Sequence, residues 1–181
     1  MGDETTGTSA ADRLGTLEDT GGGWQLRFDR HLRAAPATVW RAFAEPDLVA
    51  KWFPSTIEGD LVVGATLRFD LEGHDAEPFD GTVLEADEPR LLVFRWAGDV
   101  LRFELAEAGG GTALTMSVLL DERGKATRDG AGWHESLDRL TGLWAGGADG
   151  FVAQTWSEVQ PVYAERFGPE ASTIGPPDTA G

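Results

Sequence analysis

The segment His134-Glu135-Ser136-Leu137-Asp138 is the part of the sequence that comes nearest to a metal-binding motif. It has the spacing of the zinc motif H-E-x-x-H, with Asp in place of the second His. The chain contains only three His, and helical periodicity places His134 on the polar side of its helix. We therefore interpret this segment as surface charge and predict no metal site.

Two other histidines and one carboxylate pair are the remaining candidates for acid–base chemistry. His31 alternates with the buried positions of a strand, and His74 falls in a loop at the rim of the predicted sheet, so a solvated side chain is expected at both. Asp80 and Glu85 lie on one strand but differ by an odd number, which places them on opposite faces. Glu85 would then share a face with Val83, either as an internal polar anchor or as an exposed residue. We predict no catalytic residue among these groups.

Several classes of chemistry are excluded by what the sequence lacks. There is no Cys, so disulfides, thiolate catalysis and cysteine metal ligands are ruled out. The serine-hydrolase pattern G-x-S-x-G, the P-loop and the dinucleotide fingerprint G-x-G-x-x-G are also missing. We therefore expect no cofactor.

The charge balance limits the possible partners. Acidic residues outnumber basic ones by 31 to 15, for a formal net charge of −16, and no run of Lys or Arg could contact phosphates. Nucleic acid is therefore not expected as a partner. No stretch approaches the ~18 apolar residues of a membrane span, and no basic segment followed by an apolar run begins the chain. We expect a cytoplasmic protein without membrane insertion.

Aromatic residues are the strongest signal for a binding site. Seven Trp and nine Phe exceed what a solid core of this size needs. Each can simply pack, burying about 150–250 Å², but together they favour an apolar pocket with few polar contacts. The predicted ligand-binding residues are Trp40, Phe43, Trp52, Phe53, Phe69, Phe94, Trp96, Phe103, Trp133, Leu137 and Trp144. Among them Trp52 and Phe53, next to Pro54, are the expected gate.

The first half of the chain predicts a tail, a strand and two short helices. Residues 1–23 are rich in Gly, Thr and acidic residues and are predicted as a flexible N-terminal tail. Apolar residues alternate from Trp24 to Leu32, which indicates a half-buried strand. Pro36 and Pro46 each favour a helix start, and these helices should cover residues 36–44 and 47–52.

Strand signals separated by Gly or Asp turns follow, and they predict an antiparallel meander. The expected strands cover residues 56–63, 65–71, 79–86, 90–96, 100–106 and 112–120.

The period then changes to a helical one. Trp133, Leu137, Leu140 and Trp144 share one face of a helix predicted over residues 130–145. Residues 146–167 form a C-terminal extension with a second helical pattern, kinked at Pro161. Residues 168–181 have no periodicity and are predicted as a disordered tail. One domain is therefore expected over residues 24–145.

The order of strand, two helices, strands and long helix resembles the α+β helix-grip fold of the START-like (SRPBCC) superfamily. Within it, Arg30-x-Leu32-x-Ala34-Ala35-Pro36, Glu45-Pro46 and Lys51-Trp52-Phe53 resemble the opening motif of the homologues of the C-terminal domain of the heat-shock-protein-90 ATPase activator. Gly81-Thr82-Val83-Leu84-Glu85, Pro89-Arg90-Leu91 and Gly132-Trp133 agree in order. The resemblance implies a curved antiparallel sheet of six to seven strands, with a cavity between its concave face and the long helix.

The function that we expect is non-enzymatic binding of a hydrophobic or amphipathic small molecule in this cavity. One alternative is a role linked to a heat-shock chaperone or another protein, although the chain has no room for the N-terminal chaperone-binding domain of the eukaryotic activator. A second alternative is a cyclase- or hydrolase-type enzyme that uses the same cavity. The protein is expected to be a monomer or a homodimer.

Overall fold

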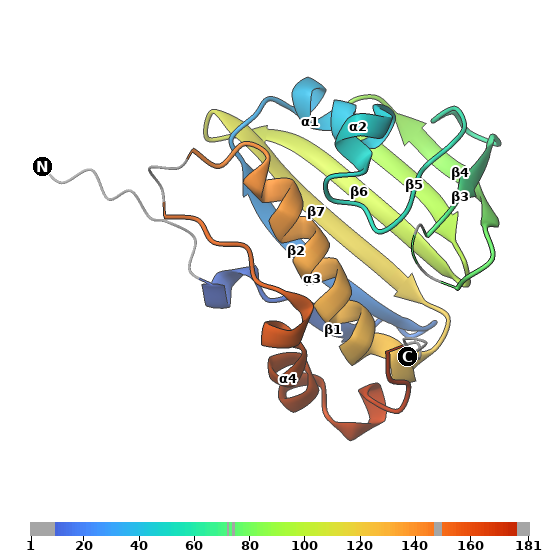
Figure 1. Cartoon of the computed structure of the whole chain (residues 1–181), viewed down its shortest axis with the longest axis vertical. Helices are drawn as coiled ribbons and strands as arrows, with labels where there is room; N and C mark the ends of the chain where they lie inside the picture. The colour runs from blue at the N-terminus through green and yellow to red at the C-terminus, as the bar shows by residue number, and fades with distance from the viewer. Residues whose placement is uncertain (1–9, 72, 74, 147–149, 177–181) are drawn as a thin grey trace, which may run out of the picture.

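A computed structural model describes residues 10–71, 73, 75–146 and 150–176 of the chain. Its centre is a seven-stranded antiparallel sheet with the strand order β1-β2-β7-β6-β5-β4-β3. The long helix α3 crosses one face of this sheet, and α1 and α2 cover another part of the same face (Figure 1). This is the predicted α+β helix-grip fold. The strands are β1 (Thr16–Asp19), β2 (Trp24–Leu32), β3 (Thr66–Phe69), β4 (Phe79–Asp87), β5 (Leu91–Trp96), β6 (Asp99–Ala108) and β7 (Gly111–Leu120).

Alternating side chains give the sheet one buried face. In β6, for example, Leu101, Phe103 and Leu105 are buried while Glu104 is exposed. The buried residues of β2, β5, β6 and β7 form one hydrophobic core with the inward side chains of the helices. Six of the predicted strands, those corresponding to β2 through β7, agree with the structure to within two residues at each end. A period of two has one favourable orientation against a core.

The helices α1 (Pro36–Ala44) and α2 (Pro46–Val49) each begin at a proline. The bounds of α1 are those predicted, whereas α2 is shorter, and single turns carry the chain on to Trp52 and Phe53. The indole N–H of Trp52 donates to the carbonyl of Ala42 at 2.8 Å. This bond ties the end of α2 to α1.

The prediction of a flexible tail is wrong for residues 10–23. Ala10–Arg13 form a 3₁₀ turn, and β1 pairs with β2 along its whole length. Gly21, Gly22 and Gly23, which were included in the predicted tail, form a hairpin turn in which the N–H of Thr20 donates to the carbonyl of Gly23 at 2.9 Å. Residues 1–9 lie outside the described part of the chain.

The predicted strand at residues 56–63 is also wrong. Only one isolated bridge, between Glu58 and Arg68, joins this segment to β3. The chain leaves the sheet at Gly59, whose φ of +129° is a conformation that side chains disfavour. Residues 55–65 are therefore an irregular connection rather than an eighth strand.

The helix α3 (Ala126–Gly142) begins four residues earlier than predicted, directly after the 3₁₀ turn Arg123–Lys125. A second helix, α4 (Trp156–Phe167), packs beside it and starts with a capping box between Thr155 and Glu158. Pro161 lies inside this helix. The extension is thus a helix docked on α3.

The prediction of disorder is wrong for residues 168–176. Pro169–Ala171 form a 3₁₀ turn in which Ala171 is buried. The N–H of Ile174 donates to the carbonyl of Gly124 at 3.0 Å, and the hydroxyls of Thr127 and Ser172 lie 2.8 Å apart. These contacts attach the segment to the start of α3. Residues 177–181 lie outside the described part of the chain.

Candidate functional site

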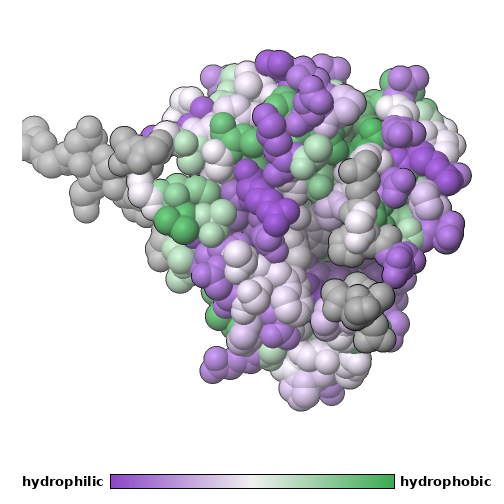
Figure 2. Space-filling model, in the orientation of Figure 1, coloured by the Kyte–Doolittle hydropathy of each residue, from purple (hydrophilic) through white to green (hydrophobic). Residues whose placement is uncertain are grey.

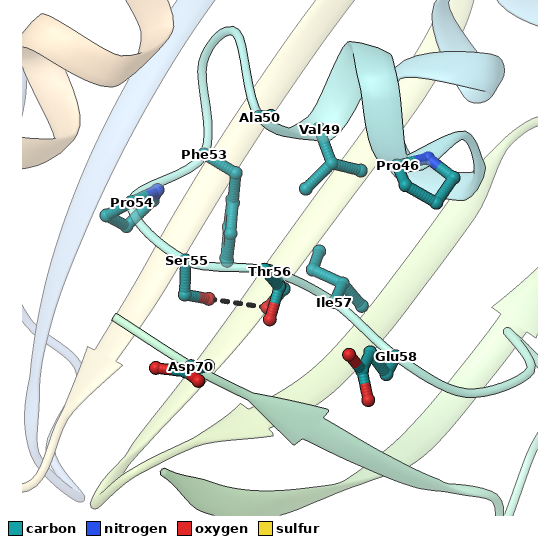
Figure 3. Close-up of a pocket in the computed structure, with 10 residues that line it drawn as sticks. All are labelled: Pro46, Val49, Ala50, Phe53, Pro54, Ser55, Thr56, Ile57, Glu58 and Asp70. Carbon is teal, nitrogen blue, oxygen red and sulfur yellow. Dashed lines mark hydrogen bonds between the residues drawn. The ribbon is translucent and has the colours of Figure 1, made fainter. Parts of the chain in front are cut away.

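A pocket of about 330 Å³ lies between α2 and the connection that follows it (Figure 3). Figure 3 shows Val49 and Phe53 pointing from α2 and its following turn toward the extended segment of residues 55–58, and Asp70 lying on the other side of that segment. The lining residues are Pro46, Val49, Ala50, Phe53, Pro54, Ser55, Thr56, Ile57, Glu58 and Asp70.

Backbone hydrogen bonds hold the outer wall of this pocket in place. The N–H of Thr56 donates to the carbonyl of Asp70 at 2.9 Å, and Glu58 and Arg68 exchange two bonds at 2.8 and 2.9 Å. This wall consists only of residues 55–58. The helical turns end at Pro54, and the chain turns away from β3 at Gly59. The sequence thus forms the pocket from the part of the chain that joins α2 to β3.

The polar groups of the pocket are hydroxyls and carboxylates. The Ser55 side chain is buried and its hydroxyl donates to the carbonyl of Thr56 at 2.7 Å. The Thr56 hydroxyl oxygen is buried and has no hydrogen-bond partner among the described residues. Glu58 and Asp70 are exposed. No Lys, Arg or His belongs to the lining.

Most of the predicted ligand-binding residues meet in one aromatic cluster between the sheet and the helices. Ring centroids lie 4.9 Å apart for Phe43 and Phe103 and 5.1 Å apart for Phe53 and Trp96. The same network of ring contacts includes Trp40, Phe43, Trp52, Phe53, Phe69, Phe94, Trp96, Phe103 and Trp133. Leu137 is buried on α3, and Trp144 is partly buried against the core. Of all these residues, Phe53 is the one that also lines the pocket.

The prediction that His134 and Asp138 lie on the surface is wrong. Both side chains are fully buried, at 0% exposure. Asp138 Oδ2 accepts hydrogen bonds from Arg13 at 2.5 Å and from the N–H of Gln154 at 3.0 Å. Asp138 Oδ1 accepts one from Arg30 at 3.3 Å. We call this group, completed by His134 and Tyr163, the Asp138 hub.

The position of the His134 proton follows from the bonds around it. The Tyr163 hydroxyl accepts the N–H of Gly15 at 2.8 Å and lies 2.9 Å from His134 Nδ1. If the hydroxyl donates to Nδ1, the ring proton sits on Nε2, which lies 3.2 Å from the Gln154 side-chain oxygen and 3.6 Å from Asp138 Oδ2. In this arrangement both ring nitrogens of His134 have a hydrogen-bond partner.

Burial and neighbouring charges shift the pKa values of Asp138 and Arg30 in opposite directions. Burial alone would raise the pKa of Asp138, but the adjacent His134 ring, the hydrogen bond from the N–H of Gln154 and the charge of Arg30 hold that pKa below its ordinary value. Burial lowers the pKa of Arg30, against the attraction of Asp138. Burial also raises the pKa of Tyr163 to about 12. The hub thus holds ionised Asp138 and neutral Tyr163 across a wide pH range.

A signal for the hub was present in the sequence. The alternation of β2 places Arg30 on the same face as Phe28 and Leu32, and a buried arginine needs a carboxylate partner. The helical pattern of α3 alone does not reveal that this partner is Asp138. In the complete chain, α4 and the N-terminal segment cover the polar side of α3. The face that looks like surface in α3 alone is an interior face of the complete chain.

The other candidate residues lie on the exterior. Asp80 and Glu85 are both exposed and pair with Arg68 and Arg102, at 3.0 and 3.1 Å. The prediction that they face opposite sides is wrong, because a register shift between Val83 and Glu85 turns the later residues of β4 over. They form no acid–base pair.

Two histidines, His31 and His74, lie outside the hub. His31 is exposed, as predicted, and its Nε2 lies 3.0 Å from the carbonyl of Ala108. His74 lies outside the described residues. The described residues contain no group of three or more metal-ligating side chains, and none of their helices is long and apolar enough to cross a membrane.

The sequence matches the family described as Activator of Hsp90 ATPase homolog 1-like protein over residues 33–145, which is more than half of the chain. The chain belongs to this family. No curated protein matches it significantly.

Solved structures share the Hsp90-ATPase-activator-like fold. A conserved protein of unknown function from Enterococcus faecalis, EF2215, is 24% identical with a TM-score of 0.70, and the match covers 84% of this chain and 89% of that one. CalU16 from Micromonospora echinospora is 22% identical with a TM-score of 0.62, covering 86% and 96%. The Aha1 dimer from Colwellia psychrerythraea is 19% identical with a TM-score of 0.57, covering 66% and 95%.

The pocket lies wholly within the part of the chain that matches the family, whereas most residues of the hub lie outside that part. Every residue that lines the pocket falls within residues 33–145, whereas the hub takes Arg13, Arg30, Gln154 and Tyr163 from outside that range. Only His134 and Asp138 of the hub lie inside it. The hub therefore joins both flanking segments to the matched domain.

Proposed function

We propose that this protein binds a hydrophobic or amphipathic small molecule and that the pocket beside α2 is its entry site. The observation that carries the proposal is the pocket itself, which adjoins the aromatic cluster through Phe53. Its volume of about 330 Å³ is at the lower end of the range of about 300–1,000 Å³ found for small-molecule sites. Val49, Phe53 and Ile57 supply its apolar wall.

Phe53 connects the pocket to the predicted ligand-binding residues. Its ring centroid lies 5.1 Å from that of Trp96 and 5.6 Å from that of Trp133. A rotation of Phe53 away from these rings would extend the pocket toward the space between the sheet and α3. In this proposal Phe53 acts as the gate, and the remaining aromatic residues form the wall of the extended site.

A neutral fluorescent probe such as N-phenyl-1-naphthylamine tests the proposal. Ala50 is exposed at the pocket, and Ala50→Trp would fill the pocket without entering the core. We expect saturable binding to the wild type and an affinity at least about tenfold lower for Ala50→Trp, because the lost volume excludes the probe. Ala44→Trp is the matched control, since Ala44 is exposed on α1 and does not line the pocket. Absence of saturable binding to the wild type, or equal binding by both variants, would contradict the proposal.

A chaperone-linked role is the second candidate. It is favoured by the family match and by two exposed apolar residues, Val62 and Val63, which are 58% and 65% exposed in the connection after α2. Elsewhere, the face shown in Figure 2 carries hydrophobic residues in small groups among hydrophilic ones. A pull-down with the purified heat-shock chaperone should then lose its signal in Val62→Ser/Val63→Ser. If the wild-type protein is not enriched in the pull-down with the chaperone, the chaperone-linked role is contradicted.

The cyclase or hydrolase alternative receives no such support. None of the buried titratable groups of the hub lines the pocket; these groups are Arg13, Arg30, His134, Asp138 and Tyr163. We therefore give the binding role precedence.

A further inference from the structure

The side chains at the polar side of the pocket accept hydrogen bonds far more readily than they donate them. The Ser55 hydroxyl already donates its proton to the carbonyl of Thr56 at 2.7 Å, so its oxygen can only accept from a ligand. Ionised Glu58 and Asp70 are acceptors only. The Thr56 hydroxyl is the one side-chain group in the lining that could donate, and it can equally accept.

The nearest arginine on the adjoining strand does not neutralise these carboxylates. Arg68 is bridged to Glu58 through the backbone, yet its guanidinium pairs with Asp80 on β4 at 3.0 Å. Among the described residues neither Glu58 nor Asp70 forms an ion pair. Two exposed carboxylates of the neighbouring strand β4 do have a cationic partner, since Asp80 pairs with Arg68 and Glu85 with Arg102, at 3.0 and 3.1 Å. The pocket is therefore a cavity with an apolar wall and an uncompensated negative side.

We infer that the ligand of this pocket is an amphipathic amine, with a protonated nitrogen and an aliphatic or aromatic body. This inference rests on the proposed function and names the ligand class of the same site. The ammonium N–H groups would donate to Glu58, Asp70 and Ser55, and the apolar body would lie against Val49, Phe53 and Ile57. A fatty carboxylate would bring a third negative charge to the same side and would find few donors there.

The expected selectivity is moderate because the carboxylates are exposed. An exposed ion pair stabilises a complex by about 0.2–1 kcal/mol, or up to about fivefold in affinity. Two such pairs therefore predict a preference of about tenfold for an amine over a neutral ligand of the same length. Salt should reduce this preference, since the Debye length falls to about 3 Å at 1 M ionic strength.

Three probes with the same chain and different heads test the inference on the full-length protein. Dodecylamine, dodecanol and dodecanoate, each below its micelle concentration, would compete with bound N-phenyl-1-naphthylamine at neutral pH and low salt. We expect dodecylamine to compete about tenfold more strongly than dodecanol, and dodecanoate to be the weakest. In Glu58→Gln/Asp70→Asn the amine should lose its advantage while dodecanol competes as before.

The control must separate a local effect from the net charge of −16. Glu107→Gln/Glu122→Gln removes two exposed carboxylates outside the pocket and should leave the order of the three probes unchanged. Dodecanoate that competes as well as dodecylamine, or an amine preference that survives Glu58→Gln/Asp70→Asn, would overturn the inference while leaving the proposed function intact. If neither the fluorescent probe nor any of the three competitors binds, the proposed function and the inference are both overturned.

Discussion

Two sets of carboxylates in this protein have opposite surroundings. Asp138 is fully buried and both of its oxygens accept hydrogen bonds from arginines. Glu58 and Asp70 are exposed at the pocket and have no cationic partner among the described residues. Asp138 is thus part of a buried network of charges, whereas Glu58 and Asp70 are solvated.

The physical basis of this difference is solvation. A buried carboxylate without partners would cost several kcal/mol, so the fold surrounds Asp138 with donors from β2, the N-terminal segment and the chain before α4. An exposed carboxylate is stabilised by water and needs no partner. Changes at the hub should therefore alter stability, and changes at the pocket should alter binding.

The largest expected effect belongs to Asp138→Asn. The substitution leaves Arg13 and Arg30 buried without an opposing charge and should destabilise the protein by about 3–5 kcal/mol. Urea denaturation followed by tryptophan fluorescence would measure the loss. Asp80→Asn, which breaks the exposed pair with Arg68, is the matched control and should cost less than about 1 kcal/mol. Equal losses in the two variants would contradict the assignment of Asp138 as the centre of the hub.

Tyr163→Phe should have an intermediate effect. It removes the hydroxyl that bonds the N–H of Gly15 and His134 Nδ1, leaving both groups buried and unpaired. The expected loss is about 1–3 kcal/mol. Hydrogen exchange provides a second measurement, because the amide of Gly15 should exchange faster in the variant. Unchanged protection at Gly15 would show that this bond does not hold the N-terminal segment.

The hub also predicts a dependence of stability on pH. Because the pKa of Asp138 is lowered, its contribution is present above the ordinary Asp value of about 3.9 and is lost as the pH falls through the lower folded value. Because the pKa of Tyr163 is raised to about 12, its contribution is present below about 10 and is lost as the pH rises toward 12. The stability difference between wild type and Tyr163→Phe should therefore shrink between about pH 10 and 12. A difference that stays constant over this range would argue against a neutral hydroxyl in the hub.

The smallest effect on stability should come from Glu58→Gln/Asp70→Asn. Both side chains are exposed and unpaired, so the free energy of unfolding should change by less than about 1 kcal/mol. The same urea experiment measures this change, and the circular dichroism of the variant should match that of the wild type. A loss comparable to that of Asp138→Asn would mean that these carboxylates belong to the folding scaffold rather than to a ligand site.

Elements with strong periodicity were predictable from the sequence. Alternating apolar residues specified β2 and β5 to β7, and Pro36 marked the start of α1. The edge strand β1 was missed because four residues give too short a pattern, and its hairpin glycines resemble a linker. The segment at residues 56–63 alternates like a strand, but the chain leaves the sheet at Gly59 after a single bridge.

The sites were harder to predict because tertiary contacts create them. Phe53 was predicted as part of a gate; it lines the pocket, and its role as a gate stays a prediction. Ser55, Glu58 and Asp70 were missed, because backbone bonds between the connection and β3 bring them to the pocket and no local pattern records those bonds. His134 and Asp138 were wrongly predicted to lie on the surface. Helical periodicity describes one helix and contains no information about the side of α3 that α4 covers.

The Asp138 hub also has a mechanical consequence. The N-terminal segment is attached to α3 through Arg13, and the C-terminal segment through Gln154 and Tyr163. A force on Arg13 would act directly on Asp138, and a force on residues 168–176 would act first on Gly124 and Thr127 at the start of α3. The long helix α3 would thus receive force from both flanking segments, because the contacts of each segment converge on it.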